Sequence, residues 1–139
     1  MLNWQKIITQ LRTMISYGIF GGIGAISDVC VFKFLCVLGV YYLLANIIGY
    51  VLGTCISFIL NRHFTFKLND KILRRVILFY VAALLGLATS MLFLYLFVEV
   101  GGISPFSAKL ATLILVFIVQ YTFNRLVTFR AARELQILV

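Results

Sequence analysis

The sequence predicts an all-α membrane protein with four transmembrane helices. Of its 139 residues, 63% are hydrophobic and 12% are charged, and the mean hydropathy is +1.11. Globular chains are nearer half apolar and a quarter charged. A chain this short cannot hide so much apolar surface in a core of its own, which excludes a soluble monomer and a disordered tail. The apolar stretches approach the length of about 20 residues that a membrane-spanning helix needs and do not alternate as barrel strands do.

Four spans are expected, over residues 14–38, 42–60, 76–98 and 108–123. The third has no charged residue, and at 1.5 Å per residue its helix would cover about 34 Å, which is enough to cross a hydrocarbon core with some tilt. Short connections at residues 39–41 and 99–107 join the spans into hairpins. Pro105 lies in the second connection, where it interrupts no helix.

The N-terminal segment, residues 1–12, predicts an interfacial amphipathic helix. Its apolar residues recur at helical spacing, and polar residues fill the other side. A cleaved signal peptide is the competing interpretation. It is disfavoured because no small-x-small cleavage site precedes Asp28 and the apolar run continues past that residue.

The charge distribution predicts the orientation in the membrane. The net charge is +8, and ten of the twelve Lys and Arg residues lie in the N-terminal segment, the central loop and the C-terminal tail. The other two, Lys33 and Lys109, lie in spans near the opposite side. The positive-inside rule then places both termini in the cytoplasm. The basic balance therefore indicates membrane topology and contact with anionic lipid heads, and not nucleic-acid binding.

The chain contains an internal repeat. The segment 61–67 (NRHFTFK) recurs as 124–130 (NRLVTFR), and the same shift of 63 residues aligns Ser27 with Ser90 and Gly39 with Gly102. We expect a single membrane domain, 1–139, built from two hairpins, 12–67 and 75–130. Two spans per copy give both copies the same orientation, a parallel repeat of the kind found in some transporters. A duplication with a purely structural role is the alternative.

Asp28 is the sharpest functional candidate, because an acid in the middle of a span costs several kcal/mol unless it is paired or hydrated. The glycines before it, from Gly18 to Gly24, would let another backbone approach closely. Asp28 could bind a cationic or hydroxyl-rich group, or a proton. Alternatively, it could form a structural ion pair with Lys109 or Lys33, or hydrogen-bond between helices. The second copy has Met91 at this position.

Two further spans each carry a polar face. The faces are Asn46, Gly49, Gly53, Ser57 and Asn61 in the second span, and Lys109, Thr112, Val116, Gln120 and Asn124 in the fourth. Helix packing explains the small residues. It explains Asn46, Lys109 and Gln120 less well, and these residues could line a route for a polar headgroup between the hairpins.

Arginines gather at the predicted cytoplasmic ends of the spans. Arg62 and Arg125 belong to the two copies of the repeated motif, and Arg12 and Arg75 precede the first and third spans. A planar guanidinium binds phosphate well, so this ring could contact a phosphate or lipid head. Ordinary positive-inside anchoring is the alternative.

The sequence shows no soluble-enzyme constellation and no metal-ligand spacing, so we expect neither catalysis nor a metal or cofactor. His63 is the only histidine. The three cysteines, Cys30, Cys36 and Cys55, are expected to be buried apolar side chains.

These motifs resemble the GtrA-like family. The resemblance rests on residues 17–28 (YGIFGGIGAISD), on Ala45-Asn46 with Gly49, and on 57–66 with Asn61 and Arg62. Ala108-Lys109 and 123–129 with Asn124 and Arg125 resemble the second half. The resemblance implies that Asn61 and Asn124 bind the substrate together with Arg62 and Arg125. The resemblance covers roughly residues 12–130. Lys33 departs from the family, which usually has an apolar residue at this position.

The resemblance implies a small four-span protein of the bacterial inner membrane that serves glycosylation of cell-surface polysaccharides, such as O-antigen or teichoic acid. The implied activity is translocation, or flipping, of a sugar linked to a polyprenyl phosphate such as undecaprenyl phosphate. A membrane glycosyltransferase would load the lipid. The alternatives are a scaffold subunit for that glycosyltransferase and a small proton-coupled cation exporter. Because four spans enclose little space, we also expect a homo-oligomer, with a dimer favoured.

Overall fold

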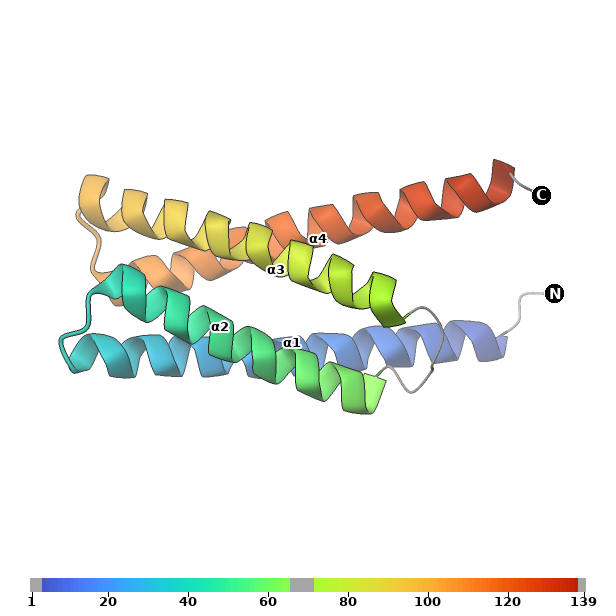
Figure 1. Cartoon of the computed structure of the whole chain (residues 1–139), viewed down its shortest axis with the longest axis horizontal. Coiled ribbons are helices and arrows are strands. Elements are labelled where there is room, and N and C mark those ends of the chain that lie inside the picture. The colour runs from blue at the N-terminus through green and yellow to red at the C-terminus, as the bar shows by residue number, and fades with distance from the viewer. Residues whose placement is uncertain (1–3, 66–71, 138–139) are drawn as a thin grey trace. The chain divides into compact units, whose positions relative to one another are not determined.

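The computed structural model consists of four long helices (Figure 1), and it describes residues 4–65 and 72–137. Their order is α1 (Trp4–Val37), α2 (Tyr42–Leu60), α3 (Ile72–Tyr95) and α4 (Pro105–Ile137). A π-helical turn follows α2, η1 (Asn61–Thr65), and another follows α3, η2 (Leu96–Val100). No strand occurs in these two ranges. The predicted all-α class is therefore confirmed.

Four helical stretches are long and apolar enough to cross a membrane, and the second and third continue from α2 and α3 into η1 and η2. These stretches are Gly18–Val37, Tyr42–Phe64, Ile77–Val100 and Pro105–Phe123. They match the four expected spans closely. Large apolar side chains such as Ile19, Leu84 and Ile114 are exposed along them, as expected where a helix faces lipid rather than water. The chain is a multi-pass membrane protein.

The separate N-terminal amphipathic helix is not confirmed. Residues from Trp4 onward belong to the same continuous helix as the first span. The segment contains no proline or glycine before Gly18 that would interrupt the helix. Its apolar residues Trp4, Ile8 and Leu11 are all exposed.

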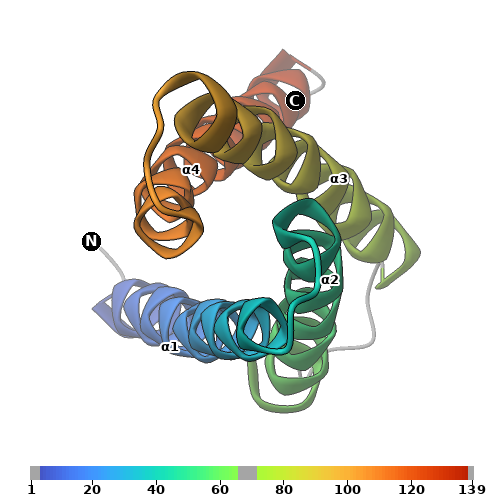
Figure 2. The same ribbon diagram turned by 90° about the vertical axis from the view of Figure 1, so that its left-hand side faces the viewer.

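The chain divides into two compact units, Met1–Asp70 and Lys71–Val139, each of which is a helical hairpin. In the first unit α1 lies alongside α2, and in the second α3 lies alongside α4 (Figure 2). The predicted repeat boundaries, 12–67 and 75–130, stay a prediction.

Glycine ends the first helix of each hairpin. Gly39 has φ +83° and Gly102 has φ +65°, a left-handed conformation that other residues adopt at a cost. After α1 the Gly39 N–H donates to Cys36 O at 3.0 Å, and the Val40 N–H donates to Leu35 O at 3.0 Å. This pair of bonds is a Schellman motif, which satisfies carbonyls that the helix leaves unpaired. The two glycines are those that the shift of 63 residues aligns.

Pro105 is the first residue of α4 and does not lie in the connection, where it was expected, although it still interrupts no helix. Proline suits this position because the first N–H of a helix has no partner within the helix. The preceding residue, Ser104, accepts the Ala108 N–H at 2.9 Å through its carbonyl oxygen. The second hairpin therefore turns before its last helix begins.

Candidate functional site

Asp28 is buried in the first unit, where it packs against two glycines of α2. Only 3% of its surface is exposed. A Cβ atom added at Gly49 would lie 2.7 Å from the Asp28 Oδ1 and 2.7 Å from its backbone oxygen. A Cβ atom added at Gly53 would lie 2.8 Å from the Asp28 Cβ. The two glycines therefore form a socket for the Asp28 side chain that a larger residue would occupy.

The backbones of α1 and α2 also meet at Gly24. A Cβ atom there would come within 2.5 Å of the Gly53 oxygen and 2.7 Å of the Ser57 Cβ. This close approach is what small residues allow in membrane helices. The expectation for the earlier glycines was wrong, since a Cβ atom at Gly18, Gly21 or Gly22 would meet nothing within 4 Å. Only the last glycine of the run faces α2.

Polar side chains occupy the buried positions that the repeat aligns in α2 and α4. Asn46 and Lys109 are both 0% exposed, and so are the preceding alanines, Ala45 and Ala108. In the part of the chain that the structure describes, no buried side-chain nitrogen or oxygen lacks a hydrogen-bond partner. Asp28, Asn46 and Lys109 each take part in a hydrogen bond, an ion pair or another polar interaction. The unfavourable burial of these polar groups is thus offset within the protein.

The η1 turn separates two residues that the sequence predicted would bind substrate together. Asn61 is 2% exposed, and its Nδ2 donates a hydrogen bond to Ser57 Oγ at 3.3 Å. Arg62, the next residue, is exposed. Asn61 therefore holds the turn against α2, whereas Arg62 is available to a ligand.

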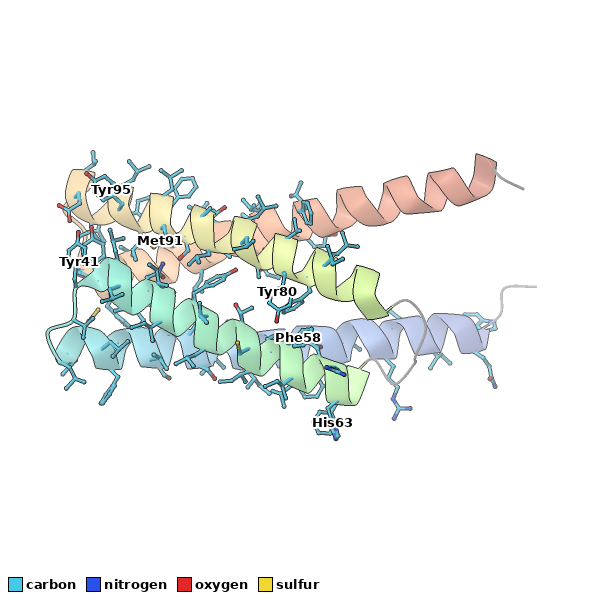
Figure 3. All side chains as sticks on the ribbon, viewed as in Figure 1. Tyr41, Phe58, His63, Tyr80, Met91 and Tyr95 are labelled. Carbon is cyan, nitrogen blue, oxygen red and sulfur yellow. The ribbon has the colours of Figure 1, made fainter. Side chains whose placement is uncertain are left out.

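Aromatic side chains fix the same turn to α1. The rings of Phe64 and Phe20 stack with their centroids 5.3 Å apart. His63 lies edge-on to Phe64 at 4.8 Å and is directed away from the helix pair (Figure 3). A stacked pair of this kind contributes about 0.5–1.5 kcal/mol beyond its burial. The turn that carries Arg62 is thus anchored at both ends.

Gln120 links the two helices of the second unit. Its Nε2 donates to the backbone oxygen of Ala82 in α3 at 3.3 Å. Earlier in α4, Thr112 and Val116 are buried on one face of the helix. The Thr112 Oγ1 donates to Ala108 O at 2.7 Å. Gln120 was predicted to bind substrate, and this bond gives it a structural role as well.

The remaining predicted site residues are arginines and the second Asn-Arg motif. Arg12 lies on α1 and is exposed. Arg75 belongs to α3, and Asn124 and Arg125 belong to α4. The side chains of these last three lie outside the described residues. The predicted arginine ring therefore stays a prediction.

Tyr50 and Ser90 are buried side chains with a polar atom that were not predicted as site residues. Tyr50 is 9% exposed and lies one turn after Asn46 on α2, so the spacing of four along that face could have revealed it. Ser90 is 2% exposed, and its repeat alignment with Ser27 marked it without indicating burial. Ser27 itself donates to Ile23 O at 2.9 Å within its own helix.

The expectation for the cysteines was wrong in two places. Cys30 and Cys55 are exposed and Cys36 is partly buried. In an apolar medium a thiol needs no burial, because lipid accepts it as readily as a protein core does. Among the residues described, no three His, Cys, Asp or Glu side chains gather as a metal site requires.

Comparison with known proteins gives one match. Residues 16–129 match the family described as "GtrA/DPMS, transmembrane domain", a range that includes both hairpins. Neither the curated proteins nor the solved structures gave a significant match. The family match agrees with the predicted resemblance and supports a role in glycosylation-related processing of lipid-linked sugars. The chain belongs to the GtrA/DPMS transmembrane-domain family.

Proposed function

We propose that the protein translocates a polyprenyl-phosphate-linked sugar across the bacterial inner membrane, with both of its termini in the cytoplasm. The delivered sugar would serve glycosylation of a cell-surface polysaccharide. Membership of the GtrA/DPMS family supports the substrate class. The observation that carries the proposal is the distribution of buried polar residues within the apolar helices.

In the first unit these residues extend along most of the membrane depth. Asn46 and Asn61 are separated by about 22 Å at the rise of an α-helix, and Asp28 packs at Gly49 and Gly53 between them. A hydrocarbon core is about 30 Å thick. Moving sugar hydroxyls and a phosphate into that core is unfavourable, because each polar group without a hydrogen-bond partner costs several kcal/mol of transfer free energy. Polar side chains at successive depths would lower this cost.

The residues suit the parts of such a substrate. Asp28 can accept hydrogen bonds from hydroxyl groups, and the Asn46 amide can donate and accept. Arg12 and Arg62 are exposed, and a guanidinium binds phosphate through two parallel hydrogen bonds. In the second unit, Lys109 is buried and supplies a basic group within that hairpin. The prenyl chain would stay in lipid beside the exposed apolar side chains.

The translocation step would exchange hydrogen bonds rather than create unpaired groups. The buried polar atoms already have partners, so a substrate hydroxyl replaces one partner with another. Asp28 and Asn46 are buried, and the helices around them must therefore move to admit a headgroup. The headgroup does not pass between α1 and α2 at Gly24, where the backbones are in contact. We propose that the gradient of loaded lipid drives transport.

The protein would act with partners. A membrane glycosyltransferase would load the lipid on the cytoplasmic side, and we expect the protein itself to form a homo-oligomer, with a dimer favoured. Since the chain supplies only two hairpins, a second copy would enlarge the protein surface around a headgroup.

Asp28→Asn in cells tests the proposal. It removes the charge with little change of shape. We expect surface glycosylation to fall while the sugar-loaded lipid accumulates, because loading precedes translocation. Asn46→Ala is expected to act in the same direction, and Cys55→Ala, an exposed position on α2, is the matched control that changes neither quantity. A scaffold for the glycosyltransferase would tolerate Asp28→Asn, and loss of the protein would abolish lipid loading, which would contradict translocation.

A further inference from the structure

We propose that Gly49 and Gly53 are positioning residues for the Asp28 carboxylate, and that their absent side chains fix where the acid meets its ligand. The inference rests on the proposed function of Asp28 and adds the residues that act through it. It concerns the contact between α1 and α2, entirely within the first unit.

The two glycines border different parts of the Asp28 side chain. The space that a Cβ atom of Gly49 would fill lies 2.7 Å from the Asp28 Oδ1, well inside the distance that such contacts allow. The space at Gly53 lies 2.8 Å from the Asp28 Cβ. Gly49 thus borders the charged end of the side chain and Gly53 borders its stem. Together they leave the carboxylate one narrow place on the face of α2.

The second hairpin shows that helix packing alone does not require glycine at these positions. The second hairpin has Met91 where Asp28 stands, and Thr112 and Val116 where the glycines stand. Both Thr112 and Val116 are buried, so a hairpin of this kind packs with larger residues at these positions. Glycine is found in the hairpin that carries the acid at the aligned position, and larger residues are found in the hairpin that does not.

A small displacement of the carboxylate is expected to have a large effect on the rate of exchange. A displacement of about 1 Å in a binding group can reduce the rate of the step it supports by about 100-fold. A methyl group at Gly49 cannot be accommodated without movement of this order. It would displace the carboxylate and, through the Asp28 backbone oxygen, also press on α1. The experiment must separate these two effects.

A double-mutant cycle separates them, with lipid exchange between leaflets of reconstituted liposomes as the readout. We expect Gly49→Ala to slow exchange at least about tenfold when Asp28 is present and less than about threefold in the Asp28→Asn protein, because the displaced charge is then already absent. Phe20→Leu is the matched control, since it disturbs the packing of the same hairpin through the stack with Phe64 and touches neither glycine. Its effect should be the same factor in both backgrounds. An equal factor for Gly49→Ala in both backgrounds would overturn the proposal.

A second readout does not depend on transport. A membrane-permeant carbodiimide modifies carboxyl groups. The chain has only four acidic residues, so mass spectrometry can assign the modification of Asp28 and follow its rate. Gly49→Ala should change the labelling rate of Asp28 by about fivefold or more, while Phe20→Leu leaves it within about twofold. Equal rates in the two variants would overturn the positioning role. If Asp28→Asn exchanges lipid as the unchanged protein does, the proposed function fails and labelling still decides the positioning.

Asp28→Glu keeps the test open should Gly49→Ala fail to fold. The longer side chain retains the charge but extends the carboxylate by one methylene group beyond its socket. We expect it to slow exchange as much as Asp28→Asn. Exchange at the unchanged rate would overturn the proposal, because a charge that works from a different place needs no positioning.

Discussion

The Asp28 carboxylate on α1 lies against Gly49 on α2, with Oδ1 2.7 Å from the point that a Cβ atom would occupy. An acid buried within a membrane span is costly, and here it sits where two helix backbones approach closely. The same contact thus packs the first hairpin and places its only buried acid among the described residues. A change at this contact will affect stability and function together unless the two are measured separately.

The contact at Gly24 should carry stability. Gly24→Ala pushes its methyl group into the Gly53 oxygen and the Ser57 Cβ, and we expect it to lower the free energy of unfolding by about 1–3 kcal/mol, the usual cost of overpacking. Unfolding in mixed micelles followed by circular dichroism measures this. Gly22→Ala is the control. Its methyl group meets nothing within 4 Å, so it should be neutral or stabilise by up to about 1 kcal/mol. Equal losses in the two variants would show that the crossing point lies elsewhere.

Asn61 and Arg62 should separate in function although they are adjacent. Asn61→Ala removes the hydrogen bond to Ser57 and should cost about 0.5–1.5 kcal/mol of unfolding free energy, with less than additive loss when combined with Ser57→Ala. Arg62→Ala should change stability by less than about 0.5 kcal/mol, because the side chain is exposed, but should slow lipid exchange. Unfolding and exchange assays on the same preparations check both. Full stability with no exchange in Asn61→Ala would make Asn61 a ligand instead.

Substitutions of the two lysines within the spans should have different effects on lipid exchange. Lys109 is 0% exposed, whereas Lys33 is exposed four residues before the end of α1. Lys109→Met removes a buried charge, and we expect it to slow lipid exchange at least about tenfold. Lys33→Met, its matched control, should stay within about twofold because an exposed lysine near a helix end reaches the interface. Similar exchange rates in the two variants would contradict a role for the buried cation.

The four helices were predictable because each depends on local composition alone. An apolar run of the right length has one stable arrangement in lipid, and Gly39 and Pro105 mark their helix ends by backbone geometry. The continuity of α1 through residues 4–18 was not predictable in this way. A change from polar to apolar composition indicates where a membrane surface lies, but it does not break the helix.

The candidate site was predictable in its residues more than in their roles. Spacing along α2 identified Asn46 and Asn61 together, yet only the structure shows that the Asn61 amide donates to Ser57. The sequence likewise does not tell which of the two glycines, Gly22 or Gly24, faces α2. Helix rotation places one against α2 and the other away from it. Such rotation depends on contacts that are distant in sequence.

The most direct measurement follows a fluorescent polyprenyl-phosphate sugar across the bilayer of liposomes that hold the purified protein, with an impermeant quencher as the probe. The account predicts exchange that depends on the protein and falls at least about tenfold in Asp28→Asn and in Arg62→Ala, with Gly22→Ala unchanged. Exchange no faster than in empty liposomes, from protein shown to be folded by circular dichroism, would contradict translocation by this protein alone.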